Sequence, residues 1–133
     1  METAHQGKRS LIFPQPPVLL AYASVAGKKE SEGPLKNTFD VTTKDTKFGQ
    51  KTWEKAETQM QKTAMLLAMQ KADLKEADLD AAFVGDLLNQ CIGSSFSMRN
   101  NGVPTFGLYG ACSTMAEGLV LAAMAVSGGF CRR

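Results

Sequence analysis

The stretch YGACST, residues 109–114, joins an apolar segment to a run of helix-forming residues. Val103–Tyr109 has the composition of a buried strand, and Thr114–Val126 is rich in Ala, Met and Leu, which favour a helix. Gly110 allows the backbone to turn tightly between the two segments. The sequence therefore predicts a strand, a sharp turn and a helix, with Cys112 where the helix begins.

Cys112 occupies a position that favours reactivity or ligand binding. A cysteine at a helix N-terminus faces the positive end of the helix macrodipole, and in an α/β domain it projects into the crevice where ligands bind. We expect the N–H groups of Ser113 and Thr114 to point out of this helix end as anion donors. The spacing leaves two interpretations open for Cys112, a nucleophile-type position and a buried structural cysteine.

The same alternation of strands and helices extends along the chain. Apolar side chains at helical spacing, after the N-cap residue Thr52, predict a long helix. Strands are expected at Val18–Val25, Ala81–Gly85, Val103–Tyr109 and from Phe130, a charged loop at Gly27–Pro34, and helices at Trp53–Lys71, Leu87–Met98 and Thr114–Val126. This βαβαβα order predicts an α/β domain with helices packed on a mostly parallel sheet.

The chain of 133 residues has the length of one domain. Residues 1–17 form a polar leader that ends in prolines, and residues 18–133 form the domain. Lys8 and Arg9 precede an apolar run, as in a secretory signal, but the prolines at 14, 16 and 17 favour a strand there. Because the sequence stops as the strand at Phe130 begins, we expect a domain truncated before its fold is complete, with an uncovered sheet edge.

Composition excludes several classes of function. The 15 Lys and Arg residues barely exceed the 13 Asp and Glu residues, without a basic cluster, so no nucleic-acid partner is expected. The single histidine, His5, lies in the leader, and no CxxC pair occurs, so no metal site and no cofactor are expected. The most apolar stretch, Gly118–Ser127, is about half the length that spans a bilayer, so no transmembrane segment is expected.

Other candidate residues have both a structural and a functional interpretation. Asp86, at the carboxyl end of a predicted strand, would either orient a ligand or cap the helix expected from Leu87, and capping is favoured because it needs only local sequence. Cys91, expected in mid-helix, and Cys131, expected at a strand start, are interpreted as core residues. The same interpretation applies to the methionines at 60, 65, 69, 115 and 124.

Several blocks resemble the stage V sporulation protein AD branch of the thiolase and β-ketoacyl synthase superfamily. GACST alone is similar to the cysteine turn of the whole superfamily, whereas GDLLNQ followed by GACST is specific to this branch. The blocks that carry the resemblance are Glu32–Leu35, Phe39–Asp40, Gln50–Glu57, Gly85–Gln90, Phe106–Thr114 and Gly128–Phe130.

The resemblance implies the first half of a thiolase-like fold. It implies a non-catalytic protein that binds dipicolinic acid and supports its uptake into the developing spore. The candidate ligand-binding residues for it are Cys112, Ser113, Thr114 and Asp86. It also implies spore membrane channel proteins as partners, a peripheral place on the cytoplasmic side of the spore inner membrane, and a homodimer through Val103–Leu108. The alternative is an acyl-transferring condensing enzyme with Cys112 as its nucleophile.

Overall fold

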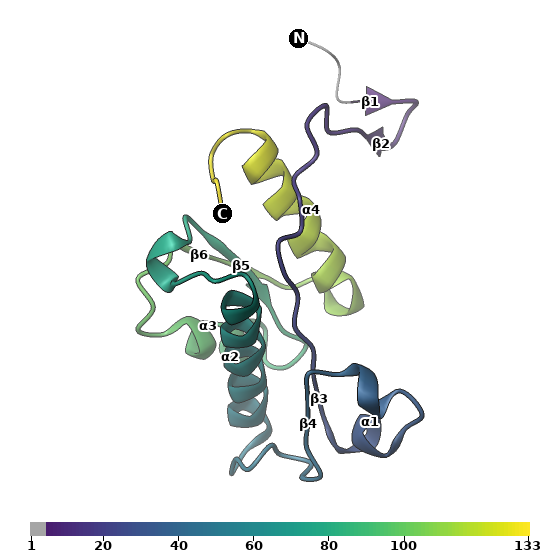
Figure 1. The fold of residues 1–133 in the computed structure, drawn as a ribbon, viewed down its shortest axis with the longest axis vertical. Helices are drawn as coiled ribbons and strands as arrows, with labels where there is room; N and C mark the ends of the chain where they lie inside the picture. The colour runs from purple at the N-terminus through teal and green to yellow at the C-terminus, as the bar shows by residue number, and fades with distance from the viewer. Residues whose placement is uncertain (1–4) are drawn as a thin grey trace.

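The computed structural model describes residues 5–133, so residues 1–4 of the predicted leader lie outside it (Figure 1). The strands are β1 (His5–Gln6), β2 (Ser10–Leu11), β3 (Val25–Ala26), β4 (Val41–Thr42), β5 (Ala82–Gly85) and β6 (Thr105–Leu108). The α-helices are α1 (Lys28–Glu32), α2 (Trp53–Lys71), α3 (Ile92–Met98) and α4 (Thr114–Ser127). Short 3-10 turns are η1 (Lys36–Thr38), η2 (Glu76–Asp78) and η3 (Ala111–Ser113).

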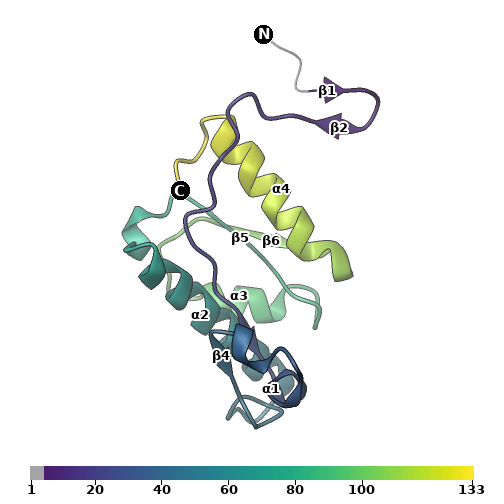
Figure 2. The same ribbon diagram turned by 45° about the vertical axis from the view of Figure 1, so that its right-hand side comes forward.

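The predicted α/β class is confirmed, and the fold is consistent with part of a thiolase-like domain. β5 and β6 pair in parallel, with Ala82 opposite Thr105 and Gly85 opposite Leu108. β3 and β4 form a second parallel pair, whereas β1 and β2 form an antiparallel hairpin. Within residues 5–133 the strands thus form three separate two-stranded sheets rather than one continuous sheet. The β5–β6 pair lies between α2 and α4 (Figure 2).

The two long helices match their predictions closely. The Thr52 side chain accepts a hydrogen bond from the Lys55 N–H at 3.3 Å, and α2 begins at the next residue, as the N-cap signal predicted. α4 begins at Thr114 and ends at Ser127, one residue beyond the prediction. None of the helices in the described part of the chain has the length and apolar character needed to cross a bilayer.

The end of β5 packs directly against the start of α4. A Cβ atom at Gly85 would lie 2.1 Å from the Thr114 Cγ2 and 2.7 Å from the Leu108 carbonyl oxygen. Such distances are too short for any side chain, so only glycine permits this approach. On the same strand pair, the rings of Phe83 and Phe106 stack with centroids 4.9 Å apart. These contacts place the turn before α4 beside the carboxyl end of β5.

The strand predicted at Val18–Val25 is wrong in extent, and so is the loop at Gly27–Pro34, which contains α1. Residues 18–24 belong to no strand, and Val18 is 80% and Tyr22 73% exposed. Pairing begins where the Asp40 carboxylate accepts a hydrogen bond from the Ser24 N–H at 2.8 Å. A tertiary contact, rather than β-propensity, therefore sets the start of β3.

The helix predicted from Leu87 begins five residues later. Asn89, Gln90 and Cys91 all have left-handed backbone conformations, with φ angles of 50°, 52° and 72°, and these prevent a right-handed helix from starting before Ile92. Cys91 is therefore the N-cap residue of α3, and its predicted mid-helix position is wrong.

The strand expected from Phe130 is absent from the described residues. The N–H groups of Phe130 and Cys131 instead bond back to the Ala125 carbonyl oxygen, at 2.9 and 3.2 Å. Gly129 takes the left-handed conformation (φ 76°) that this type of helix end requires. The predicted strand start at Cys131 is wrong for the same reason, because these N–H groups close the end of α4.

Candidate functional site

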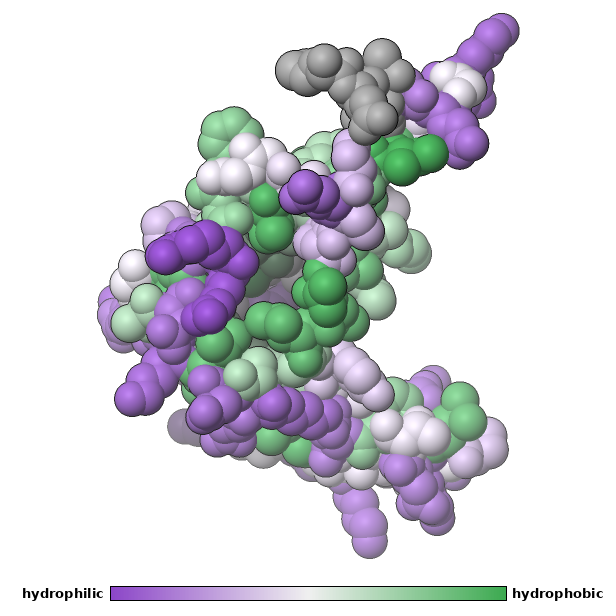
Figure 3. All heavy atoms as spheres, turned by 45° about the horizontal axis from the view of Figure 1, so that its top comes forward, coloured by the Kyte–Doolittle hydropathy of each residue, from purple (hydrophilic) through white to green (hydrophobic). Residues whose placement is uncertain are grey.

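An open pocket with a volume of about 850 Å³ lies between α2 and α4, at the carboxyl ends of β5 and β6. Figure 3 shows a hollowed face of the molecule with hydrophobic side chains gathered around the hollow. The pocket walls include Met60 from α2 and Met115 and Leu119 from α4. Met115 is 78% exposed, so its predicted place in the core is wrong. The walls of this pocket suit an apolar or aromatic ligand.

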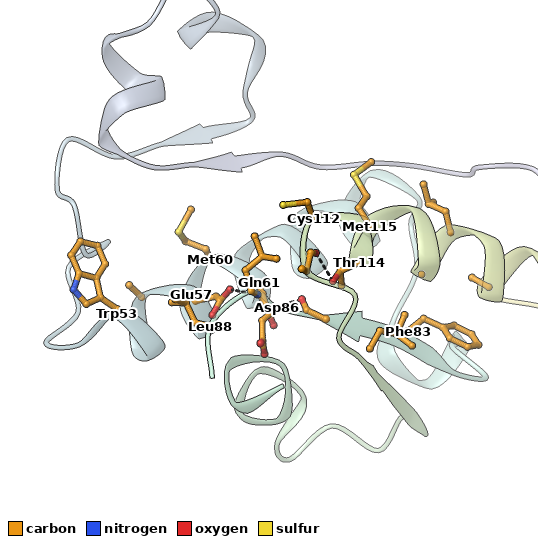
Figure 4. Close-up of a pocket in the computed structure, with 18 of the residues that line it drawn as sticks. Trp53, Glu57, Met60, Gln61, Phe83, Asp86, Leu88, Cys112, Thr114 and Met115 are labelled. Atoms are coloured by element: carbon orange, nitrogen blue, oxygen red, sulfur yellow. Dashed lines mark hydrogen bonds between the residues drawn. The ribbon is translucent and has the colours of Figure 1, made fainter. Parts of the chain in front are cut away.

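The cysteine turn, Gly110–Thr114, forms one side of the pocket (Figure 4). Cys112 is exposed and lines the pocket together with Thr114, whereas Ser113 does not line it. The turn holds itself together: the Gly110 N–H donates to the Thr114 Oγ1 at 3.0 Å, and the Ser113 hydroxyl donates to the Gly110 carbonyl oxygen at 2.6 Å. The buried structural alternative for Cys112 is therefore wrong, because the thiol is exposed at the pocket.

The predicted anion donors within this turn are wrong. The Ser113 N–H donates to the Gly110 carbonyl oxygen at 3.0 Å, and the Thr114 N–H donates to the Ala111 carbonyl oxygen. Both N–H groups are thus hydrogen-bonded within or next to the 3-10 turn η3, which the sequence did not predict. The N–H groups of Ala111 and Cys112 are the ones left without an acceptor among residues 5–133.

The backbone at Gly110 and Ala111 explains how those two groups are presented. Gly110 has φ −113° and ψ 24°, and Ala111 follows with a left-handed φ of 49°. A right-handed residue followed by a left-handed one forms a nest, in which successive N–H groups converge on one concavity that binds anions. The turn before α4 therefore offers an anion nest, one residue earlier than expected.

The cap favoured from the sequence, Asp86 before a helix from Leu87, is wrong, because α3 begins at Ile92 with Cys91 as its N-cap residue; Asp86 instead binds donors at the start of α3 through its side chain. Its side chain is buried, 3% exposed, and lies at the edge of the pocket. One carboxylate oxygen accepts from the Cys91 N–H at 2.9 Å, and the other accepts from the N–H and the hydroxyl of Ser94, both at 2.8 Å. With three donors bound, the carboxylate is held in place by the protein itself.

Glu57 and Gln61, which sequence reasoning missed, lie one helical turn apart on α2 and reach the pocket beside Asp86 (Figure 4). The Glu57 Oε1 accepts from the Leu87 N–H at 3.5 Å, and the Gln61 Nε2 donates to the Gly85 carbonyl oxygen at 3.3 Å. The other oxygens, Glu57 Oε2 and Gln61 Oε1, are buried and have no hydrogen-bond partner among residues 5–133. The spacing of four residues between two polar side chains was the available signal.

The electrostatics of the pocket are acidic. Burial raises the pKa of Glu57, the Leu87 N–H opposes this, and the negative charges of Asp86 and Glu54 raise it further. No Lys, Arg or His of the described residues lines the pocket, and His5 lies outside it in β1. The pocket thus combines apolar walls and an anion nest with a carboxyl group that is costly to ionise.

These features define this chain as an α/β domain, consistent with part of a thiolase-like fold, with a cysteine turn beside an apolar pocket. The model of the family Stage V sporulation protein AD (SpoVAD) matches residues 7–133, and the chain belongs to this family. Stage V sporulation protein AD of Bacillus subtilis (strain 168) is 38% identical to it over 127 residues, which are 96% of this chain. The chain spans 38% of the length of that curated relative. The family predicted from the sequence is confirmed.

Proposed function

We propose that this chain contributes a non-catalytic binding pocket for dipicolinic acid and supports its uptake into the developing spore. The family membership supports a role in sporulation. The observation that carries the ligand is the anion nest at Gly110–Ala111, because Ala111 and Cys112, whose N–H groups are free among residues 5–133, both line a pocket with apolar walls. Dipicolinic acid is a flat aromatic ring with two carboxyl groups, so it needs both features: N–H donors for a carboxylate and apolar surface for the ring.

The experiment is a calorimetric titration of the whole protein with dipicolinate. Cys112→Trp fills the side of the pocket beside the nest, and we expect it to abolish measurable binding. Cys112→Ala should change affinity less than about threefold, since a non-covalent site loses only a few contacts there. Ser127→Trp, at the exposed far end of α4, is the matched control and should bind normally. A folded Cys112→Trp protein with unchanged affinity would place the ligand elsewhere.

We also propose a homodimer through Val103–Leu108. β6 pairs with β5 along one edge, and no other strand of residues 5–133 covers its second edge. Phe106 on this strand is 53% exposed. An uncovered edge strand is a liability unless another chain pairs with it, and two copies related by a two-fold axis would satisfy both edges.

The further partners in this proposal are channel proteins of the spore membrane, with the chain peripheral to the cytoplasmic side of the spore inner membrane. This part of the proposal extends from the resemblance that the sequence carries. Co-purification of the whole protein from membranes of sporulating cells, before and after a high-salt wash, tests it. We expect association without detergent extraction, and a protein recovered entirely away from the membrane fraction would contradict the placement.

A further inference from the structure

One oxygen of the Glu57 carboxyl group makes no hydrogen bond in the described part of the fold. The Oε2 atom is buried, has no hydrogen-bond partner among residues 5–133, and would lie 2.9 Å from a Cβ atom at Gly93. The missing side chain at Gly93 therefore leaves just enough room for this oxygen. One turn along α2, the Gln61 Oε1 is also a buried acceptor without a donor. A buried acceptor without a donor costs free energy, and a proton on Glu57 would turn its Oε2 from an acceptor into a donor.

The charges around Glu57 all have the same sign. Glu54 on α2 and Asp86 after β5 are both negative, and they are the charged groups that act on Glu57. α3 presents the uncharged Gly93 and Ser94 there, and the side of the pocket formed by η3 and α4 adds only the thiol of Cys112. No cation from any element lines the pocket within the described residues.

We propose that Glu57 takes up a proton from solvent when an anionic ligand enters the pocket, and that it is then a neutral carboxylic acid beside the ligand. This inference rests on the proposed function, in which a dicarboxylate occupies the pocket. One carboxylate of such a ligand lies at the Gly110–Ala111 nest, and its other acceptor atoms face the polar end of the pocket. An ionised Glu57 would repel them, whereas a Glu57 that carries a proton on its buried Oε2 is neutral and does not.

Independent evidence supports the direction of this effect. Burial already raises the pKa of Glu57, and a bound anion raises it further because it adds negative charge nearby. Asp86 does not serve this role, because both of its carboxylate oxygens already accept hydrogen bonds, from the Cys91 N–H and from the N–H and hydroxyl of Ser94. By linkage, affinity for the anion decreases as pH rises through the pKa of Glu57, by at most about tenfold per pH unit.

The test is calorimetric titration of the whole protein with dipicolinate at about pH 6, above the ordinary range of a carboxyl group, in two buffers with different ionisation enthalpies. The difference between the measured enthalpies counts the protons taken up. We expect up to about one proton per bound ligand in the wild type. Glu57→Gln should bind without proton uptake and with an affinity that no longer depends on pH. Glu76→Gln, exposed on η2, is the matched control and should behave as the wild type.

Each outcome separates the two proposals. Binding of dipicolinate by the wild type without proton uptake overturns the role of Glu57 and leaves the proposed function standing. Uptake that persists in Glu57→Gln also overturns it, since the proton then goes to another group. No binding at all overturns the proposed function together with this inference. If Glu57→Gln does not fold, Glu57→Asp, which keeps a titratable carboxyl group, replaces it. The number of protons taken up by the wild type and by Glu57→Asp then decides whether the role of Glu57 stands.

Discussion

The carboxylate of Asp86 accepts two hydrogen bonds from Ser94, one from its N–H and one from its hydroxyl, both 2.8 Å long. Both residues are buried, 3% and 1% exposed. The pair ties the end of β5 to the first turn of α3, across a turn with three left-handed residues in succession. It therefore fixes the backbone that forms the edge of the pocket.

The Asp86–Ser94 pair should contribute measurably to stability. Asp86→Ala removes the acceptor for three donors, and we expect the free energy of unfolding to fall by about 2–3 kcal/mol. Ser94→Ala removes only the hydroxyl bond and should cost about 1 kcal/mol. Urea unfolding of both variants and of the double variant measures this. Additive losses in the double variant would contradict the pairing.

Cys112 should react with alkylating reagents faster than the other two thiols. Cys112 is exposed, whereas Cys91 and Cys131 are partly buried, and the Cys91 thiol donates to the Leu108 carbonyl oxygen at 3.3 Å. Timed alkylation of the folded protein, followed by peptide mapping, gives the order. Equal rates in denaturant provide the control, and faster labelling of Cys91 or Cys131 in the folded state would show the assignment to be wrong.

Incubation of the whole protein with acyl-CoA donors should give no covalent adduct at Cys112. Nucleophilic catalysis requires a base beside the thiol, and among residues 5–133 the titratable side chains that share the pocket with Cys112 are those of Glu57 and Asp86. Intact-mass measurement checks this. A stoichiometric acyl adduct that disappears in Cys112→Ser would favour the condensing-enzyme alternative.

Asp80 should make stability depend on pH in acid. Hydrogen bonds from the side chain and the N–H of Arg132 lower the pKa of Asp80 to about 2 from its ordinary 3.8. Since the folded-state pKa is the lower one, the stabilisation is complete above the ordinary value and is lost as pH falls from about 4 to about 2. The Tm difference between wild type and Asp80→Asn should therefore shrink over this range. Asp73→Asn is the control, and a constant difference for Asp80→Asn would argue against the ion pair.

A charge on the free edge of β6 should weaken the proposed dimer. Thr105→Lys places like charges near each other when two copies pair along this edge, and we expect the dimer dissociation constant to rise at least tenfold. Sedimentation velocity of the whole protein over a concentration series measures the change. Thr42→Lys, exposed on β4, is the matched control. An unchanged constant for Thr105→Lys would move the interface away from β6.

Features set by local sequence could be predicted, and features set by distant contacts could not. The Thr52 cap and the turn before Thr114 depend on neighbouring residues, and both lie where the sequence placed them. β3 depends on Asp40, which bonds Ser24 and forms an ion pair of 2.6 Å with Lys71 at the far end of α2. No local pattern near residue 18 contains that information.

The candidate site likewise has features that local sequence predicts and features that depend on distant contacts. The position of Cys112 at the start of a helix followed from a local turn signal, but the choice of free N–H groups depended on η3, a detail of backbone geometry. Glu57 and Gln61 were not found because the helical pattern of α2 separates apolar from polar residues. It does not tell which polar residues face a cavity rather than solvent.

Gly85 belongs to a part of the pocket that substitution cannot reshape, whereas other walls can change. An added Cβ atom at Gly85 would lie 2.7 Å from the Leu108 carbonyl oxygen, a backbone atom of the neighbouring strand. Met60 and Met115, by contrast, are flexible side chains on helix surfaces. Members of this family that bind ligands of other sizes should therefore differ at the two methionines and keep this glycine. A library designed to alter the ligand should randomise the walls only.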